Sequence, residues 1–109
     1  MFTVTDTYTF TRPVKVLVPA NGGHDQQEFK ATFRVIPVDE QDGYDLGTAE
    51  GSSAFLRAII VELSDLVDGN DEPLPYSEGL RDRLLRFQFI RVALTTTYFD
   101  AIKKAVAGN

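Results

Sequence analysis

The sequence predicts an α+β fold, in which N-terminal antiparallel β-strands that form a hairpin precede a C-terminal three-helix region. Up to residue 36, apolar and polar residues alternate with a period of two, which is typical of half-buried strands. From residue 52 onward, apolar residues recur every three or four positions, which is typical of amphipathic helices. The 109 residues fit a single domain, 1–109, with a β-rich segment (1–38), a polar connector (39–51) and a helical part (52–107).

The first expected strand covers residues 2–11 and has one apolar face and one threonine face. Its apolar face contains Phe2, Val4, Tyr8 and Phe10. The threonine face is either solvated or a sheet surface that awaits a partner. Because Pro13 has no amide hydrogen to donate, we expect the chain to turn or to lie at a sheet edge there.

Two further strands are expected at residues 14–18 and 28–36. Between them, the segment "PANGGHDQQ" contains residues that tolerate positive φ, which predicts an antiparallel hairpin with a long loop. The connector that follows is acidic and rich in glycine, so no helix or strand is expected in it.

Three helices are expected in the second half of the chain. The first begins at Ser52 or Ser53, either of which can accept a hydrogen bond from an orphan amide, and ends between residues 64 and 67. The second begins with Ser77 as its N-cap. A bend near residues 87–88 separates it from the third, whose C-terminal end carries Lys103 and Lys104 and is closed by Gly108.

Composition argues against several classes of partner. The formal net charge is −5, so the surface repels nucleic-acid phosphates and anionic membranes. The sequence has no apolar run long enough to span a bilayer and shows no signal peptide, which predicts a soluble, cytoplasmic protein. The absence of cysteine suits a reducing compartment.

No motif points to catalysis, so we expect a protein that is not an enzyme and needs no cofactor. One histidine, His24, and no cysteine cannot form a His/Cys metal cluster within one chain. The acidic segment 65–77, "DLVDGNDEPLPYS", fails as an EF-hand loop. With Gly69 at the sixth position, Ser64, Leu66 and Pro75 fall where oxygen ligands are required. We therefore interpret it as a connector between two helices and expect no metal site.

The order of motifs in the second half is more specific than any one of them. The apolar helix "AFLRAIIVELSDLV" leads into the acidic glycine-containing turn, then into "EPLPYS" and "EGLRDRLLRFQFIRVALTTTYFDAI". Over residues 52–106 this order resembles the small tail assembly chaperones of long-tailed bacteriophages. The N-terminal stretches "VKVLVPANGG" and "EFKATFRVIPV" are similar to the β segment with which members of that family often begin.

The resemblance implies a function and a set of partners. Such a chaperone acts in the host bacterial cytoplasm, where it binds the long, apolar tape-measure protein and keeps it soluble during tail assembly. Tail-tube subunits then replace it, and family members self-associate. The alternative is a structural tail component of the tube, terminator or connector type, which would use its threonine-faced strands to form rings.

An apolar groove between helices would suit the chaperone reading, because an amphipathic helix can lay its apolar face in it. The candidate protein-binding residues are Phe55, Ile59, Phe87, Phe89, Tyr98 and Phe99. Each of these also suits the core of a small domain. Phe99, beside Tyr98 and off the main apolar stripe, is the residue that we most expect to contact a partner. We further expect Phe99→Asp to abolish binding and leave the fold intact.

Overall fold

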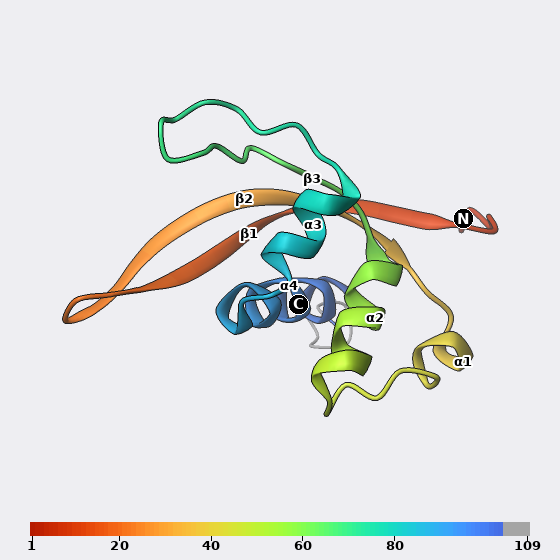
Figure 1. Ribbon diagram of the computed structural model, residues 1–109. Helices are drawn as coiled ribbons and strands as arrows, with labels where there is room; N and C mark the ends of the chain where they lie inside the picture. The colour runs from red at the N-terminus through yellow and green to blue at the C-terminus, as the bar shows by residue number, and fades with distance from the viewer. Residues whose placement is uncertain (104–109) are drawn as a thin grey trace.

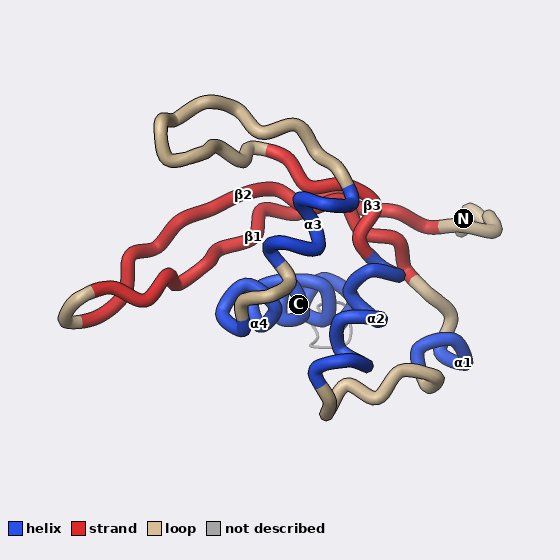
Figure 2. Tube along the Cα trace, in the orientation of Figure 1, coloured by secondary structure: helices blue, strands red, loops and turns tan. Residues whose placement is uncertain are grey.

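The computed structural model describes residues 1–103 and has the expected α+β architecture. Three antiparallel strands lie in the order β1-β2-β3, and Figures 1 and 2 show the sheet curving over α4. The elements are β1 (Tyr8–Ala20), β2 (Gly23–Val35), α1 (Val38–Gln41), α2 (Ala49–Ile59), β3 (Ile60–Ser64), α3 (Glu78–Leu84) and α4 (Gln88–Lys103). None of these helices is long and apolar enough to cross a membrane.

The hairpin of β1 and β2 is longer and tighter than the sequence suggested. β1 runs through Pro13 without a break, and only Asn21 and Gly22, at φ +79°, separate it from β2. The predicted turn at Pro13 and the predicted long loop are therefore wrong. In an antiparallel pair, alternate residues direct their backbone groups away from the partner strand. Pro13 and Pro19 both fall on that outward phase at the free edge of β1, so neither removes a bond to β2.

Residues 1–7 do not belong to a strand, which corrects the prediction that a strand starts at Phe2. Phe2 and Val4 are 78% and 83% exposed, so they do not join an apolar face. The segment instead folds back on Tyr8, whose hydroxyl accepts from the Thr5 amide at 3.2 Å and donates to the Thr3 carbonyl at 3.1 Å. β2 ends at Val35, opposite Tyr8, so residues 1–7 have no partner strand. The alternation of apolar and polar residues does not show where the partner strand ends.

The outward face of the hairpin is open to solvent, and it is polar around Thr9 and Thr11. Thr9 and Thr11 are exposed, and the Thr11 hydroxyl lies 2.8 Å from that of Thr32 on the neighbouring strand. The inward face carries Val14, Val16, Phe29, Ala31 and Phe33, all buried. The strand predicted at residues 14–18 lies within β1, and the one predicted at residues 28–36 lies within β2 except for its last residue.

The connector contains structure that the sequence did not predict. It includes the short helix α1, and α2 begins at Ala49 rather than after Ser52 or Ser53. Thr48 is the N-cap of α2, because its hydroxyl accepts from the Gly51 amide at 3.0 Å. At Gly51 a β-carbon would lie 2.1 Å from the Asp45 carbonyl oxygen, so this close approach requires glycine.

The expected first helix is split, because α2 ends at Ile59 and the chain continues directly as β3. The predicted helix end between residues 64 and 67 is thus wrong. β3 pairs with residues 30–33 of β2, with an irregularity between Thr32 and Phe33. The β-branched Ile60 and Val61 suit a strand. The edge of β2 provides backbone hydrogen-bond partners for them, and the local sequence gives no sign of these partners.

The last two helices begin where the sequence predicted. The Ser77 hydroxyl accepts from the Leu80 amide at 3.0 Å and caps α3. A bend at residues 85–87 separates α3 from α4, which confirms the expected break. Lys103 occupies the last turn of α4, whereas the expected contributions of Lys104 and Gly108 lie outside the described residues.

One apolar core lies between the sheet and the helices. α2 contributes Phe55, Leu56 and Ile59, and α4 contributes Leu94 and Tyr98, all essentially inaccessible to solvent. Because the hairpin extends beyond these helices, its tip projects from the body of the molecule (Figure 1). The inner part of β1 is covered by α4, and this pairing positions the candidate site described next.

Candidate protein-binding site

The six predicted binding residues fall into two groups. Phe55, Ile59 and Tyr98 are fully buried and contact other residues of the same chain. Phe87 is 52% exposed, while Phe89 and Phe99 are half-buried at the border of the core. The structure therefore does not bring the six together into one surface groove between helices. Only the second group offers side-chain surface to a partner.

Tyr98 is the centre of an aromatic cluster inside the protein. Its ring lies 5.3–6.1 Å, centroid to centroid, from those of Phe10, Phe33, Phe55 and Phe99. The hydroxyl accepts from the Ile36 amide at 3.2 Å and so satisfies a buried donor at the end of the sheet. Burial raises the pKa of Tyr98, and the Ile36 hydrogen bond opposes that rise.

Phe99 is more deeply involved in this cluster than its position off the main stripe suggested. Its ring stacks on that of the fully buried Phe55 at 5.6 Å and an interplanar angle of 5°. The Lys103 ammonium lies over the Phe99 ring, 5.4 Å from its centroid. A charge introduced by Phe99→Asp would lie against the core, so this substitution cannot separate binding from folding.

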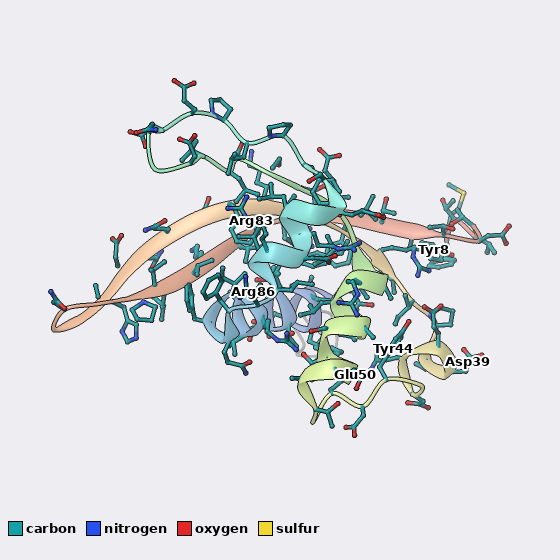
Figure 3. All side chains as sticks on the ribbon, viewed as in Figure 1. Tyr8, Asp39, Tyr44, Glu50, Arg83 and Arg86 are labelled. Atoms are coloured by element: carbon teal, nitrogen blue, oxygen red, sulfur yellow. The ribbon has the colours of Figure 1, made fainter. Side chains whose placement is uncertain are left out.

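The junction of α3 and α4 presents the most accessible aromatic pair. The rings of Phe87 and Phe89 lie 6.0 Å apart, one just before α4 and one in its first turn. The nearby Arg83 and Arg86 are exposed, and Figure 3 shows both at α3 and the bend that follows it. Two exposed arginines thus lie close in sequence to an apolar pair, and polar residues often border the apolar surfaces that bind proteins.

Phe89 also borders a groove between β1 and α4. The groove has a volume of about 810 Å³, and its apolar lining includes Leu17, Phe89, Val92 and Ala93. Leu17 and Val92 are 55% and 52% exposed. Its polar lining includes Arg12 and Lys15 from β1 and Asp100 from α4.

Leu17 and Val92 are not among the binding residues predicted from the sequence. A signal for both existed, because each is an apolar residue out of phase with its element. On β1, the exposed Leu17 lies between the buried Val16 and the half-buried Val18, so its side chain is on the opposite face of the strand. Val92 lies between buried Arg91 and Ala93 on α4 but is itself exposed. Such out-of-phase residues mark apolar surface that the chain does not bury.

A second, smaller hollow lies on the other side of Phe89. It has a volume of about 240 Å³ and lies among β1, β2, the segment after β3 and the α3–α4 junction. Its lining includes Val18, Phe29, Val67, Leu84 and Phe89. Phe89 therefore separates two hollows, and its side chain lines both.

A buried arginine fixes the helix junction beside this surface. Arg91, only 9% exposed, donates to the Ser53 hydroxyl at 2.6 Å, to the Leu85 carbonyl at 2.7 Å and to the Ala49 carbonyl. It thereby joins the first turn of α4 to the end of α3 and the start of α2. The sequence offered no sign of this role, because Arg91 follows Ile90 in a region where arginines are common.

The acidic segment 65–77 builds a small hairpin-like turn. The Asp68 carboxylate accepts from the amides of Asn70 at 2.7 Å and Glu72 at 3.0 Å, and Val67 pairs with Pro73. The segment connects β3 to α3, not two helices, which corrects the predicted connection. Within residues 1–103, no group of three or more histidine or carboxylate side chains is placed to hold a metal ion. His24 is exposed near the hairpin tip.

Comparisons of the chain with protein-family models, with curated proteins and with solved structures find no match.

Proposed function

We propose that this chain is a tail assembly chaperone of long-tailed bacteriophages, which binds the tape-measure protein in the host cytoplasm and keeps it soluble. The order of motifs over residues 52–106 supports this proposal. The structural observation that carries it is the apolar groove between β1 and α4, bordered by Phe89 and close in sequence to the exposed Phe87.

The groove suits a partner that is a long apolar helix. Leu17, Phe89 and Val92 come from two elements and line one groove. Their exposure to water does not stabilise the free domain, so it is better explained by a partner that covers them. A helix that covers them buries apolar surface on both molecules, at roughly 25 cal/mol per Å². Binding of this kind needs no cofactor and no catalytic residue, and replacement by tail-tube subunits can release the chaperone.

A structural tail component that forms rings is the second candidate. The observation that favours it is the 13-residue edge strand β1, whose outer edge has no neighbour within the described sheet. Rings would form if the edge strands or threonine faces of adjacent copies paired. Pro13 and Pro19 weaken this candidate, because they remove two of the amide donors that such pairing would use.

Co-expression with the tape-measure protein encoded nearby tests the proposal. We expect the tape-measure protein to become soluble and to co-elute with many copies of this chain in size-exclusion chromatography with light scattering. Phe87→Asp should reduce the amount retained, because it places a charge on the apolar pair. The matched control is Val38→Asp, which changes an exposed residue of α1.

The opposite result is equally clear. If the chain alone forms closed rings and leaves the tape-measure protein insoluble, the chaperone proposal is wrong and the structural candidate replaces it.

A further inference from the structure

We propose that the groove between β1 and α4 receives an amphipathic helix that carries acidic residues beside its apolar face. This inference rests on the proposed function and specifies which segments of the partner the groove selects. It follows from three features of the groove: the interrupted hydrogen-bonding capacity of the β1 edge, the small side chains on α4, and the local excess of positive charge.

The edge of β1 favours a helix over an added strand. A strand that extends a sheet needs a continuous series of backbone donors and acceptors along the edge. On β1, Pro13 and Pro19 interrupt the outward-facing amides, which leaves only Lys15 and Leu17 as donors between them. A ladder over the groove would therefore be short and broken. A helix satisfies its own backbone and needs only side-chain contacts from this wall.

The α4 wall is shaped for close approach of a second helix. Ala93, Thr97 and Ala101 recur every four residues and line the groove. Small side chains in such a row allow two helix axes to approach within about 8 Å. Phe89 and Val92 stand at one end of this row and supply the apolar contacts. The lining from Phe89 to Ala101 is about 18 Å long at 1.5 Å per residue, which corresponds to slightly more than three helical turns.

The charge of the groove is opposite to that of the molecule. Arg12 and Lys15 line it, and Asp100 is the one carboxylate among the lining residues. The ion pairs recorded within residues 1–103 include neither Arg12 nor Lys15. The chain as a whole carries a formal charge of −5. Acidic side chains on a partner are therefore attracted to the two cations of this groove, although the net charge of the chain is negative.

Nucleic acid is the other anionic macromolecule that cations attract. Two cations neutralise few phosphates, so the release of counterions contributes little to binding of a nucleic acid here. The apolar side chains of Leu17, Phe89 and Val92 would remain uncovered by a phosphate backbone. These features favour a protein helix, and nucleic-acid binding becomes one outcome of the experiment.

Two synthetic peptides test this inference directly. Both are amphipathic helices of about 18 residues with the same leucine face, flanked by glutamate in one and by lysine in the other. We expect fluorescence anisotropy at low salt to show at least about tenfold tighter binding of the glutamate peptide to the full chain. The difference should shrink as salt is added, because both cations are near solvent.

Three variants locate the binding. Lys15→Glu should weaken the glutamate peptide and strengthen the lysine peptide. Val92→Asp changes an exposed groove residue and should weaken both peptides, whereas Val38→Asp on α1 should change neither. Circular dichroism establishes that each variant is folded before binding is measured. Equal affinities for the two peptides, or binding that Lys15→Glu leaves unchanged, would show that the inference is wrong. Tighter binding of a mixed-sequence single-stranded DNA would do the same.

The outcome also separates this inference from the proposed function. If the wild-type chain retains the tape-measure protein but does not distinguish the peptides, the inference fails and the function stands. If the chain binds the glutamate peptide in the groove but does not retain the tape-measure protein, the inference stands and the function fails.

Discussion

At the scale of single residues, Arg91 stands out because it is the one charged residue that is buried among residues 1–103. Its guanidinium is the donor for two backbone carbonyls and one hydroxyl from two segments: α2, at Ala49 and Ser53, and the end of α3, at Leu85. Buried carbonyls that lose their donor keep the cost of desolvation without the hydrogen bond. The orientation of α4, and with it one wall of the groove, depends on this side chain.

We expect Arg91→Ala to lower the free energy of unfolding by about 3 kcal/mol, because it removes hydrogen bonds made by a charged donor. Arg91→Lys should lose less, since an ammonium can still donate to one or two of the acceptors. Urea denaturation measures both. Arg57→Ala, at an exposed position on α2, is the matched control. A loss in Arg91→Ala no larger than in the control would contradict this role.

Tyr98 allows a prediction about pH. Burial raises the pKa of Tyr98 in the folded chain, so the folded chain keeps this phenol protonated where the unfolded chain ionises it. The stability that this group contributes is full below about pH 10, the ordinary tyrosine pKa, and is lost as the pH rises above it. Between pH 9 and pH 11 we expect the melting temperature of the wild type to fall more than that of Tyr98→Phe.

At neutral pH, Tyr98→Phe leaves the Ile36 amide without its acceptor and should cost about 1–2 kcal/mol. Thermal unfolding over a pH series gives both results from one set of samples. Equal pH dependence in the two proteins would show that Tyr98 ionises normally in the folded state.

At the scale of elements, the sequence predicted well wherever local signals decide the structure. Ser77 marks the start of α3, and the alternation of apolar and polar residues identifies the buried faces of β1 and β2. It failed where distant segments decide. Ile59, Ile60 and Leu63 fit a helical period, yet residues 60–64 form β3 because residues 30–33 of β2 present a free edge. Pro13 suggested a break in the strand. Only the register with β2 shows that its backbone nitrogen points away from β2, so that the strand can continue through it.

The two prolines of β1 are expected to protect its edge. We expect the double variant Pro13→Thr, Pro19→Thr to self-associate at lower concentration than the wild type, since it restores outward amide donors. Light scattering over a concentration series measures this. Monomer stability should change by at most about 1 kcal/mol, which is the usual effect of proline on the unfolded chain. A variant as monodisperse as the wild type would show that these prolines do not guard the edge.

At the scale of the whole molecule, the candidate site was only partly predictable. Phe87 and Phe89 could be predicted because they are aromatic residues at a break between two helices, where side chains often remain accessible. Phe55, Ile59 and Tyr98 were included with them because hydrophobicity alone does not tell core from surface. The groove itself could not be predicted, because Leu17 and Val92 lie far apart in the sequence and meet only when α4 packs against β1.

The N-terminal segment gives a prediction at this scale. Residues 2–7 make local hydrogen bonds with one another and with Tyr8, and Phe2 and Val4 remain exposed. We therefore expect removal of residues 2–7 to change the free energy of unfolding by less than about 0.5 kcal/mol. Thermal unfolding of the shortened chain measures this. A clear fall in melting temperature would show that the segment packs on the domain.

The hairpin and α4 lie at opposite ends of the chain, and this order has a consequence for synthesis on the ribosome. The hairpin is complete once Val35 has emerged, but its inward side chains Val14, Val16 and Phe29 wait for a helix that begins at Gln88. At about 5–20 residues per second, the intervening 52 residues take about 3–10 seconds. During that interval each nascent chain in a polysome displays an uncovered apolar sheet, and the interrupted edge of β1 limits its pairing with the nascent chain beside it.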